Sequence, residues 1–227
     1  MELTILMPCL NESASVAFCV REATAYLKSR EIAGEVLIAD NGSTDGSREL
    51  ASAAGGRIIT VPEKGYGNAI RAGIAAAKGQ YIILGDCDGS YDFSDLDPIL
   101  AKLRHGWQLV VGDRFAGGIA PGAMPLSHRY FGVPLLSWLG RKRFCVELGD
   151  FHCGLRGISR EAALQLDFRC GGMAFATEMI GCFADAGLRI TQVPVALRRD
   201  LRRGPGHLRT VPDGFRHMML LLFWKRR

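Results

Sequence analysis

Two carboxylates separated by one residue are the strongest candidates for chemistry in this chain. Asp86 and Asp88 directly follow an apolar run over residues 80–84, and they lie in a turn rather than inside a strand. Hard divalent cations such as Mg²⁺ and Mn²⁺ prefer oxygen ligands and readily share phosphate oxygens with a protein. A metal site is therefore one interpretation. The other is a polar turn with two solvated aspartates, because a D-x-D pattern alone is a weak signal.

Polar residues follow two further apolar runs. The first run of the chain leads into Asn11 and Glu12, and a second run (EVLIA) ends at Asp40 in the turn sequence DNGSTDG. We expect Asp40 to accept hydrogen bonds from a base or ribose, as acidic residues do at strand ends of nucleotide-binding sheets. The alternative is a plain Asx-turn. Neither a G-x-G-x-x-G nor a P-loop pattern follows the first run, which disfavours a dinucleotide-binding or P-loop enzyme.

The elements that must position these residues alternate between strand and helix. Continuous apolar strands with intervening helices favour an α/β fold with a mainly parallel central sheet and helices on both faces. Functional loops of such sheets lie beyond the carboxyl ends of the strands, so we expect the polar strand ends to meet at one edge. The predicted strands are residues 3–10, 35–39, 57–61 and 80–84, and the predicted helices are residues 15–28, 47–54 and 68–78.

The second half of the chain is less regular. No repeat or low-complexity linker divides it, and we expect one domain over residues 1–207, followed by an amphipathic basic segment over residues 208–227. The predicted strands are residues 109–111, 155–159 and 189–195, the predicted helices are residues 95–104, 130–139, 161–166 and 177–186, and residues 116–125 form a Gly/Pro-rich loop.

Composition and charge narrow the class of protein. The chain has 227 residues, 48% hydrophobic and 22% charged, as in soluble globular domains. The formal net charge of +5 belongs to the tail: from Arg198 on there are nine Lys or Arg and two Asp, against 19 basic and 21 acidic residues before it. Such a tail suits phosphates or anionic lipid, or is merely solvated. The apolar run over residues 218–224 is far shorter than the roughly 20 residues that span a bilayer.

The cysteines and the start of the chain indicate a cytosolic protein. Seven cysteines occur without a C-x-x-C pair, which fits reduced thiols and gives no sign of a zinc site. The chain opens on an apolar, strand-like run, from which we expect no signal peptide.

Seven short motifs occur in a specific order over residues 3–205. They are PCLNE at 8–12, DNGSTDG at 40–46, KGYGNA at 64–69, DCDG at 86–89, VVGDRF at 110–115, DFHCGLR at 150–156 and FATEM at 175–179. In this order and spacing they resemble family 2 glycosyltransferases of the GT-A fold. The closest branch is the dolichyl- or polyprenyl-phosphate mannosyl- and glucosyltransferases.

The resemblance implies a nucleotide-sugar donor, a divalent cation and a role for each matched residue. Asp86 and Asp88 would hold Mg²⁺ or Mn²⁺ together with the diphosphate. The implied donor-binding residues are Pro8, Asn11, Glu12, Asp40, Asn41, Lys64, Gly65, Asp86, Cys87, Asp88 and Arg114. The implied acceptor or phosphate-binding residues are Arg129, His152, Arg156, Arg202 and Arg203. The family's basic loop ends in Ser-Lys and residues 199–205 here do not, so Arg202 or Arg203 would substitute through bidentate phosphate contacts.

The implied reaction is an inverting displacement at the anomeric carbon, with Asp88, Arg114, Glu178 and Asp150 as candidate catalytic residues. A phosphate acceptor is already anionic and needs no general base. A hydroxyl acceptor needs one, and Glu178 or Asp150 is the candidate. Glu178 could equally be a helix-face residue paired with an arginine, and His152 a structural loop residue.

The implied acceptor is a polyprenyl phosphate at the cytoplasmic face of a membrane, with the protein bound peripherally through residues 208–227. These residues could instead form a helix docked on the core or in a dimer. A GT-A enzyme acting on a hydroxyl of a soluble acceptor or glycan is the main alternative. A non-catalytic nucleotide-sugar-binding module is a further one, and a nucleotidyltransferase is disfavoured because its Gly-rich opening loop is missing. We expect no nucleic-acid partner.

Overall fold

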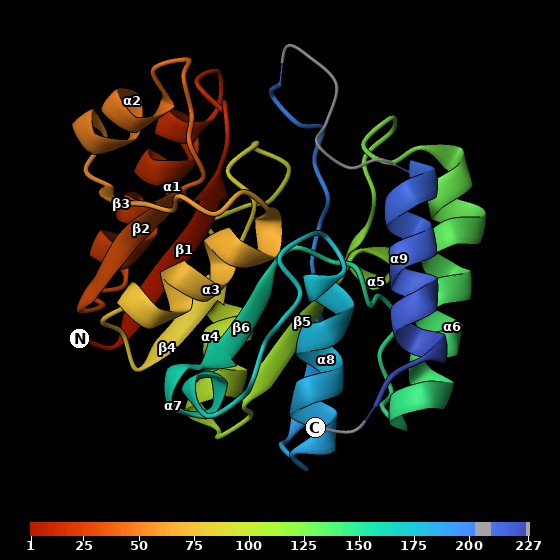
Figure 1. The fold of residues 1–227 in the computed structure, drawn as a ribbon. Coiled ribbons are helices and arrows are strands. Elements are labelled where there is room, and N and C mark those ends of the chain that lie inside the picture. Colours follow the sequence, from red (N-terminus) through yellow and green to blue (C-terminus); the bar gives the residue numbers. More distant parts are fainter. Residues whose placement is uncertain (203–209, 226–227) are drawn as a thin grey trace.

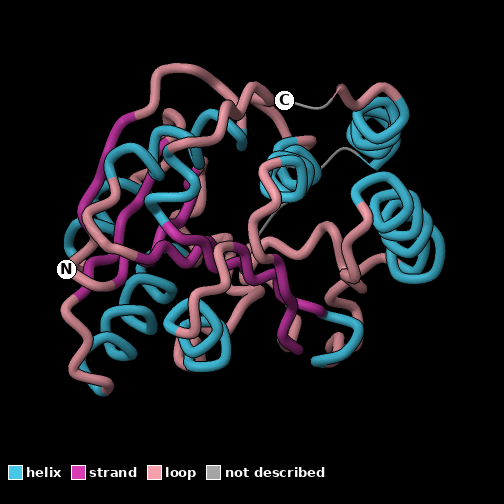
Figure 2. The backbone as a smooth tube through the Cα atoms, turned by 90° about the horizontal axis from the view of Figure 1, so that it is seen from below, coloured by secondary structure: helices cyan, strands magenta, loops and turns pink. Residues whose placement is uncertain are grey.

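The fold is a seven-stranded sheet with helices on both faces. The computed structural model describes residues 1–202 and 210–225. Figure 2 shows the strands as one band with helices packed above and below it. On one face α1 is tied to α4, because the Tyr26 hydroxyl donates a hydrogen bond of 2.9 Å to Asp97 Oδ1. The predicted α/β class is therefore confirmed.

The sheet is mainly parallel, with a single reversed strand. Its order is β3-β2-β1-β4-β6-β5-β7. Strand β6 is antiparallel to β4 and β5, and every other pairing is parallel. The strands are β1 (Leu3–Cys9), β2 (Gly34–Asp40), β3 (Arg57–Thr60), β4 (Tyr81–Leu84), β5 (Leu109–Asp113), β6 (Arg156–Ser159) and β7 (Ile190–Pro194).

The predicted helices follow their ranges to within two residues at each end, with one exception, and the short helix over residues 114–117 was not predicted. Residues 130–139 were expected to form one helix, and the structure has a π-helical turn η1 followed by α6, which extends five residues further. The helices are α1 (Val16–Ser29), α2 (Ser47–Ala53), α3 (Tyr66–Ala76), α4 (Asp97–Arg104), α5 (Arg114–Gly117), η1 (His128–Gly132), α6 (Val133–Phe144), α7 (Arg160–Leu164), α8 (Phe175–Asp185) and α9 (Thr210–Leu222).

Strand β1, which lies between β2 and β4, sets the position of the polar strand ends. Its apolar side chains are fully buried because helices cover both faces of the sheet. In the parallel register Cys9 lies opposite Asp40 on β2, and Leu6 lies opposite Leu84 on β4. The three strands therefore end at the same edge, as the alternating pattern predicts.

The last described helix, α9, docks on the protein's own core. It packs against α6 and α8 at the right of Figure 1. Trp224, just beyond α9, donates an indole hydrogen bond of 2.9 Å to Asp185 and lies edge-on to Phe144 at 5.1 Å between ring centroids. The predicted boundary between residues 207 and 208 lies outside the described residues. Across residues 1–202 and 210–225, no helix has the length and apolar character that crossing a membrane requires.

Candidate active site

Two cavities meet at the turn that carries Asp86 and Asp88. The sheet-edge cavity, of about 500 Å³, lies over the ends of β1, β2 and β4. The helix-side cavity, of about 440 Å³, is bounded by η1, α6 and α9. The residues that line both are Tyr66, Asp86, Asp88, Tyr91, Arg114, His152 and Met173. Two molecules bound in the two cavities would therefore meet beside the carboxylate pair.

Most of the predicted donor-binding residues line the sheet-edge cavity. Asn41 organises one wall: its Oδ1 accepts a 2.7 Å hydrogen bond from Gly65 N, and its carbonyl oxygen accepts one of 2.7 Å from Lys64 Nζ. Gly65 has φ of 131°, and a Cβ there would collide with Gly171 O, so this position requires glycine. The predicted residues at this cavity are Pro8, Glu12, Asn41, Lys64, Gly65, Asp86, Cys87, Asp88, Arg114 and Arg202.

Two predicted donor-binding residues do not line either cavity. Asp40 is fully buried, and its carboxylate accepts hydrogen bonds from Gly42 N at 3.1 Å and Ser43 N at 3.2 Å. Asn11 Oδ1 accepts a 2.9 Å hydrogen bond from Thr44 N. Both side chains hold the turn of residues 40–46 in shape. The Asx-turn alternative therefore describes Asp40 better than direct contact with a ligand.

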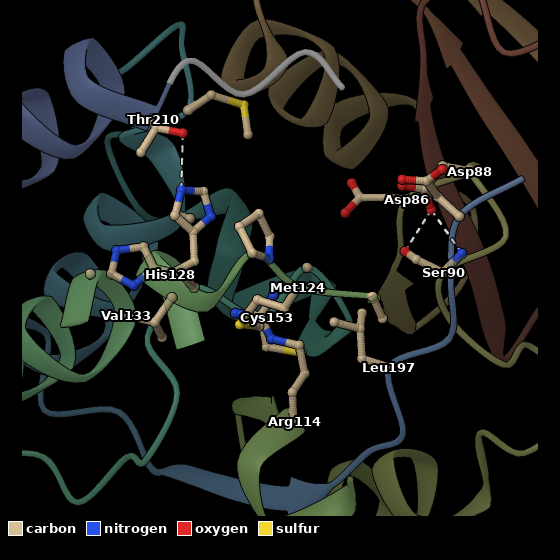
Figure 3. Close-up of a pocket in the computed structure, with 18 of the residues that line it drawn as sticks. Asp86, Asp88, Ser90, Arg114, Met124, His128, Val133, Cys153, Leu197 and Thr210 are labelled. Carbon is tan, nitrogen blue, oxygen red and sulfur yellow. Dashed lines mark hydrogen bonds between the residues drawn. The ribbon is translucent and has the colours of Figure 1, made fainter. Parts of the chain in front are cut away.

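The carboxylate pair is not a solvated turn. Asp88 is 6% exposed, and its Oδ1 accepts hydrogen bonds from Ser90 N at 2.9 Å and Ser90 Oγ at 2.6 Å (Figure 3). Burial, followed by the charge of Asp88, raises the pKa of Asp86 above its ordinary value, although the hydroxyl of Tyr66 favours the charged form of Asp86 and acts to lower its pKa. A cation beside the pair would relieve this repulsion.

Arg202 already neutralises part of this negative charge. Its Nη2 lies 2.6 Å from Glu12 Oε1, and its Nη1 lies 3.2 Å from Asp88 Oδ2. Burial acts against the guanidinium charge, but the hydrogen bond to Glu12 and the charge of Asp88 outweigh it and raise the pKa of Arg202. Arg202 therefore competes with any cation that approaches Asp88.

The residues fit a divalent cation that is shared with a ligand. Among the described residues, no three His, Cys, Asp or Glu side chains are grouped as metal ligands. Asp86 and Asp88 can supply two carboxylate ligands from one turn, and both face the two cavities. Mg²⁺ is commonly bound by one or two carboxylates plus substrate phosphates. The donor set therefore suits a cation completed by a diphosphate.

Arg114 is held at the junction of the cavities by Asp150. Its Nε and Nη2 lie 2.5 Å and 2.9 Å from the two carboxylate oxygens of Asp150, which is a bidentate pair. Burial disfavours the charge of Arg114, but Tyr91 and Asp150 outweigh it and hold the pKa well above its ordinary value. Asp150 itself is 1% exposed and lines neither cavity. The predicted catalytic role fits Arg114 by position, whereas Asp150 is placed to orient it.

Two other predicted site residues are buried away from the cavities. The Glu178 carboxylate accepts hydrogen bonds from the backbone N–H groups of Arg169 at 2.9 Å and Cys170 at 2.8 Å. Arg156 donates to the carbonyl oxygens of Phe151, Cys153 and Ala176 at 2.6–2.8 Å. Both brace the backbone around the helix-side cavity rather than face a ligand.

The helix-side cavity is mainly apolar, with His128 and Arg114 among its polar members. Met124, Val133 and Leu197 form part of its wall (Figure 3). His128 hydrogen bonds Thr210 Oγ1 at 3.0 Å, which ties η1 to α9. The predicted Arg129 does not line this cavity; its guanidinium lies 5.6 Å from the ring centroid of Tyr130. The predicted Arg203 lies outside the described residues.

His152, predicted on the acceptor side, lines both cavities and contacts a second histidine. Its ring lies 4.5 Å from that of His217, and Thr177 Oγ1 lies 2.7 Å from His217 Nδ1. Burial, and then the charge of His217, lowers the pKa of His152 well below its usual range. Burial, and then the charge of Arg156, lowers the pKa of His217 to about 4. Both rings are therefore neutral at pH 7.

Sequence reasoning missed the contribution of α9. Thr210, Gly214 and His217 line the helix-side cavity, while Asp213 and Arg216 line the sheet-edge cavity. No local pattern marks these positions, because only the docking of α9 on α6 and α8 brings them to the site. Tyr66 and Tyr91 were also missed, although both stand within or beside motifs that the sequence singles out.

The seven-stranded sheet with helices on both faces is the GT-A fold of nucleotide-diphospho-sugar transferases. The paired cavities lie at the edge of this sheet. The Glycosyl transferase family 2 profile matches residues 4–166. The chain therefore belongs to glycosyl transferase family 2, as its motifs indicate.

Known relatives and solved structures agree with this assignment. The hexosyltransferase Agl6 of low-salt glycan biosynthesis in Haloferax volcanii is 37% identical over 221 residues, which are 97% of this chain but only 53% of Agl6. The chain thus spans about half the length of that relative. The dolichyl-phosphate hexose transferase of the same organism is 25% identical, covering 87% of this chain and 83% of that protein.

A solved structure provides a nucleotide-bound comparison. Glucosyl-3-phosphoglycerate synthase from Mycobacterium tuberculosis, crystallised with Mn²⁺, uridine diphosphate and phosphoglyceric acid, has a TM-score of 0.68 and 26% identity. The match covers 90% of this chain and 72% of that one.

Proposed function

We propose that this protein is an inverting glycosyltransferase that moves a hexose from a GDP-mannose- or UDP-glucose-type donor to a polyprenyl or dolichyl phosphate. The proposal includes a Mg²⁺ or Mn²⁺ ion held by Asp86 and Asp88. The observation that carries it is the junction of two cavities at the same carboxylate pair. The sheet-edge cavity holds most of the predicted donor-binding residues, and the helix-side cavity has an apolar wall that includes Met124, Val133 and Leu136.

The sheet-edge cavity suits the nucleotide-sugar. Lys64 and Arg202 offer positive charge, and Asp86 and Asp88 offer cation ligands. The mycobacterial synthase crystallised with Mn²⁺ and uridine diphosphate supports this pairing of a metal with a nucleoside diphosphate. Mg²⁺ or Mn²⁺ bound by the pair would supply positive charge opposite the departing diphosphate.

The transfer itself is a single displacement. An oxygen of the acceptor phosphate attacks the anomeric carbon from the helix-side cavity and forms a new C–O bond. The bond from that carbon to the diphosphate oxygen breaks on the opposite side, and the nucleoside diphosphate leaves with the electron pair, so the configuration inverts. Arg114, fixed by Asp150, is positioned to bind the phosphate oxygens at the junction.

The acceptor assignment rests on the walls of the helix-side cavity. Met124, Val133 and Leu136 supply an apolar wall beside Arg114 and His128. The chain neighbours of these wall residues are exposed and apolar: Leu126, Tyr130, Phe131, Leu135 and Trp138 are between 49% and 74% exposed. A lipid phosphate has the matching anionic head and apolar chain. The dolichyl-phosphate hexose transferase among the relatives supports this choice.

The positions of the candidate general bases also favour a phosphate acceptor, because such an acceptor needs no base. Glu178 and Asp150, the sequence's candidates for a general base, are buried and engaged elsewhere. A hydroxyl of a soluble acceptor or glycan remains the second candidate, because Asp200 is an exposed carboxylate that lines the helix-side cavity and could take a proton.

The proposal includes peripheral binding at the cytoplasmic face of a membrane, which the exposed apolar residues of α9 support. Val211, Phe215 and Leu222 are 56–78% exposed, and Lys225 follows the helix with a positive charge. Apolar side chains next to basic ones suit an interface with anionic lipid.

The test is a transfer assay with UDP- and GDP-hexoses, Mn²⁺ and either a polyprenyl phosphate or the matching polyprenol. We expect product only with the phosphate, loss of product with EDTA, and loss in Asp88→Ala. Transfer to a hydroxyl acceptor, sensitive to Asp200→Asn, would establish the second candidate instead. Donor binding without hydrolysis or transfer to either acceptor would indicate a binding module.

A further inference from the structure

Two cysteines lie together at the wall of the sheet-edge cavity. Cys9 is the last residue of β1, and Cys87 stands between Asp86 and Asp88. They are 2% and 1% exposed, and both belong to the lining of the cavity. Both are free thiols.

The sheet register places these thiols side by side. Strands β1 and β4 pair in parallel from Leu3 opposite Tyr81 to Leu6 opposite Leu84, a constant offset of 84 − 6 = 78 residues. The same offset carried past the strand ends puts Cys9 opposite Cys87.

Two contacts keep this alignment past the end of β4. Gly85 N donates a 3.1 Å hydrogen bond to Leu6 O, and Cys87 Sγ donates one of 3.2 Å to Pro8 O. The Cys87 thiol also lowers the pKa of Cys9, so the two side chains lie within interaction range. Neighbouring strands run about 4.8 Å apart, and disulfides form between Cα atoms about 4.4–6.8 Å apart. The pair can therefore be joined with a local shift of the turn.

We propose that Cys9 and Cys87 are an oxidation site, at which a peroxide converts the two thiols into a disulfide that weakens donor binding. One sulfur attacks a peroxide oxygen, the O–O bond breaks, and a sulfenic acid and one water result. The second sulfur then attacks the sulfenic sulfur, the S–S bond forms, and the hydroxyl leaves as water with the thiol proton. In total, two thiols and one hydrogen peroxide give one disulfide and two waters.

The disulfide would move the cation ligands. Forming an S–S bond of about 2.05 Å draws Cys87 toward β1 and removes its hydrogen bond to Pro8 O. Asp86 and Asp88 flank Cys87, so their carboxylates shift with it. Metal–ligand distances in a well-formed site lie within about 0.2 Å of their standard values, so a shift of both carboxylates disturbs the site. Oxidation should therefore lower affinity for a nucleoside diphosphate with Mn²⁺, a readout that rests on the proposed function.

The experiment treats the full chain with hydrogen peroxide and maps disulfides by peptide mass spectrometry. We expect a Cys9–Cys87 cross-link, a mass loss of about 2 Da and full reversal by dithiothreitol. Affinity for UDP or GDP with Mn²⁺ should fall at least tenfold on oxidation and return on reduction. The variants Cys9→Ser and Cys87→Ser can start from a different affinity for the nucleoside diphosphate. Peroxide treatment should leave the affinity of each variant at its own starting value. Cys145→Ser, at the exposed end of α6, should respond to peroxide like the wild type.

The outcomes separate this proposal from the proposed function. Absence of the Cys9–Cys87 peptide, or its formation without a change in affinity, overturns the oxidation site. If the reduced protein binds neither nucleoside diphosphate, the donor assignment fails, and the cross-link mapping still decides whether the two thiols couple.

Discussion

The two cavities that meet at Asp86 and Asp88 are built in different ways. Short segments at the ends of three neighbouring strands supply a large part of the lining of the sheet-edge cavity, and polar groups of this lining bind one another before any ligand arrives. The helix-side cavity draws part of its lining from η1 and α6 and from the distant helices α8 and α9, which meet only through packing. Hydrogen bonds between histidine and threonine side chains tie η1 and α8 to α9.

This difference suggests a division of labour. A sheet edge repeats the same backbone geometry, so it can hold a constant group such as a metal-bound diphosphate. Packed helices can vary without disturbing the sheet, so they suit the variable acceptor. Substitutions at the sheet edge should therefore abolish donor chemistry, whereas substitutions around α9 should act through stability and acceptor use.

The largest effect is expected for Asp88→Asn. Removing one charged cation ligand should lower the transfer rate by about a thousandfold or more, equivalent to about 4 kcal/mol. The side-chain amide oxygen of this variant can still accept the hydrogen bond from Ser90 N, so the thermal unfolding midpoint should change little. The matched control is Asp92→Asn, a carboxylate of the same segment that pairs with Arg198 and lines neither cavity. A rate close to wild type in Asp88→Asn would end the metal assignment.

A smaller loss is expected for Asp150→Asn. Arg114 would lose its bidentate partner, and its misplacement should lower turnover by about a hundredfold with little change in the KM for the donor. Glu178→Gln is the control, because that buried carboxylate binds backbone N–H groups instead of Arg114. Steady-state kinetics at saturating acceptor measure both. Equal losses of turnover in the two variants would assign Asp150 a purely structural role.

We expect Arg202→Gln to strengthen the binding of Mn²⁺ alone and to weaken the binding of a nucleoside diphosphate. Without Arg202, Asp88 is free of its competitor, so Mn²⁺ alone should bind about tenfold more tightly. A nucleoside diphosphate in the presence of Mn²⁺ should bind about tenfold more weakly, because a charged phosphate contact is lost. Isothermal titration gives both constants. Arg199→Gln removes a nearby charge whose Nε donates to Pro121 O, and it should change neither constant. Weaker binding of Mn²⁺ alone would contradict the competition.

The smallest effect is expected on the free energy of unfolding at acid pH, through a histidine of the helix-side cavity. The folded-state pKa of His217 is lowered to about 4, below the unfolded value of about 6.5, so the unfolded chain binds the proton more readily. Stability is therefore lost as pH falls from about 6.5 toward 4. Between pH 7 and 5.5, His217 should account for about 1 kcal/mol of the loss. Urea unfolding of the wild type and His217→Asn measures it. An identical pH dependence in both would exclude this role for His217.

The motifs predicted the sheet-edge cavity better than the helix-side one. Asn41, Lys64 and Asp86 were expected there and line it, because strand ends of a parallel sheet meet whatever the details of packing. The Asp40 carboxylate points back into its own turn. A carboxylate at a strand end can point outward or back, and the sequence does not distinguish the two. Arg129 was expected on the acceptor side, but its neighbour His128 in the π-helical turn is the residue that lines the helix-side cavity.

The sequence by itself determined the strand–helix alternation, the edge at which the polar turns gather and the family, because apolar periodicity and short motifs are local properties of the chain. Only the tertiary structure decided which carboxylates face a cavity, that Asp150 serves Arg114, and that α9 completes the site. These features depend on contacts between residues far apart in sequence. Their free energy comes from packing and burial, which no single segment encodes.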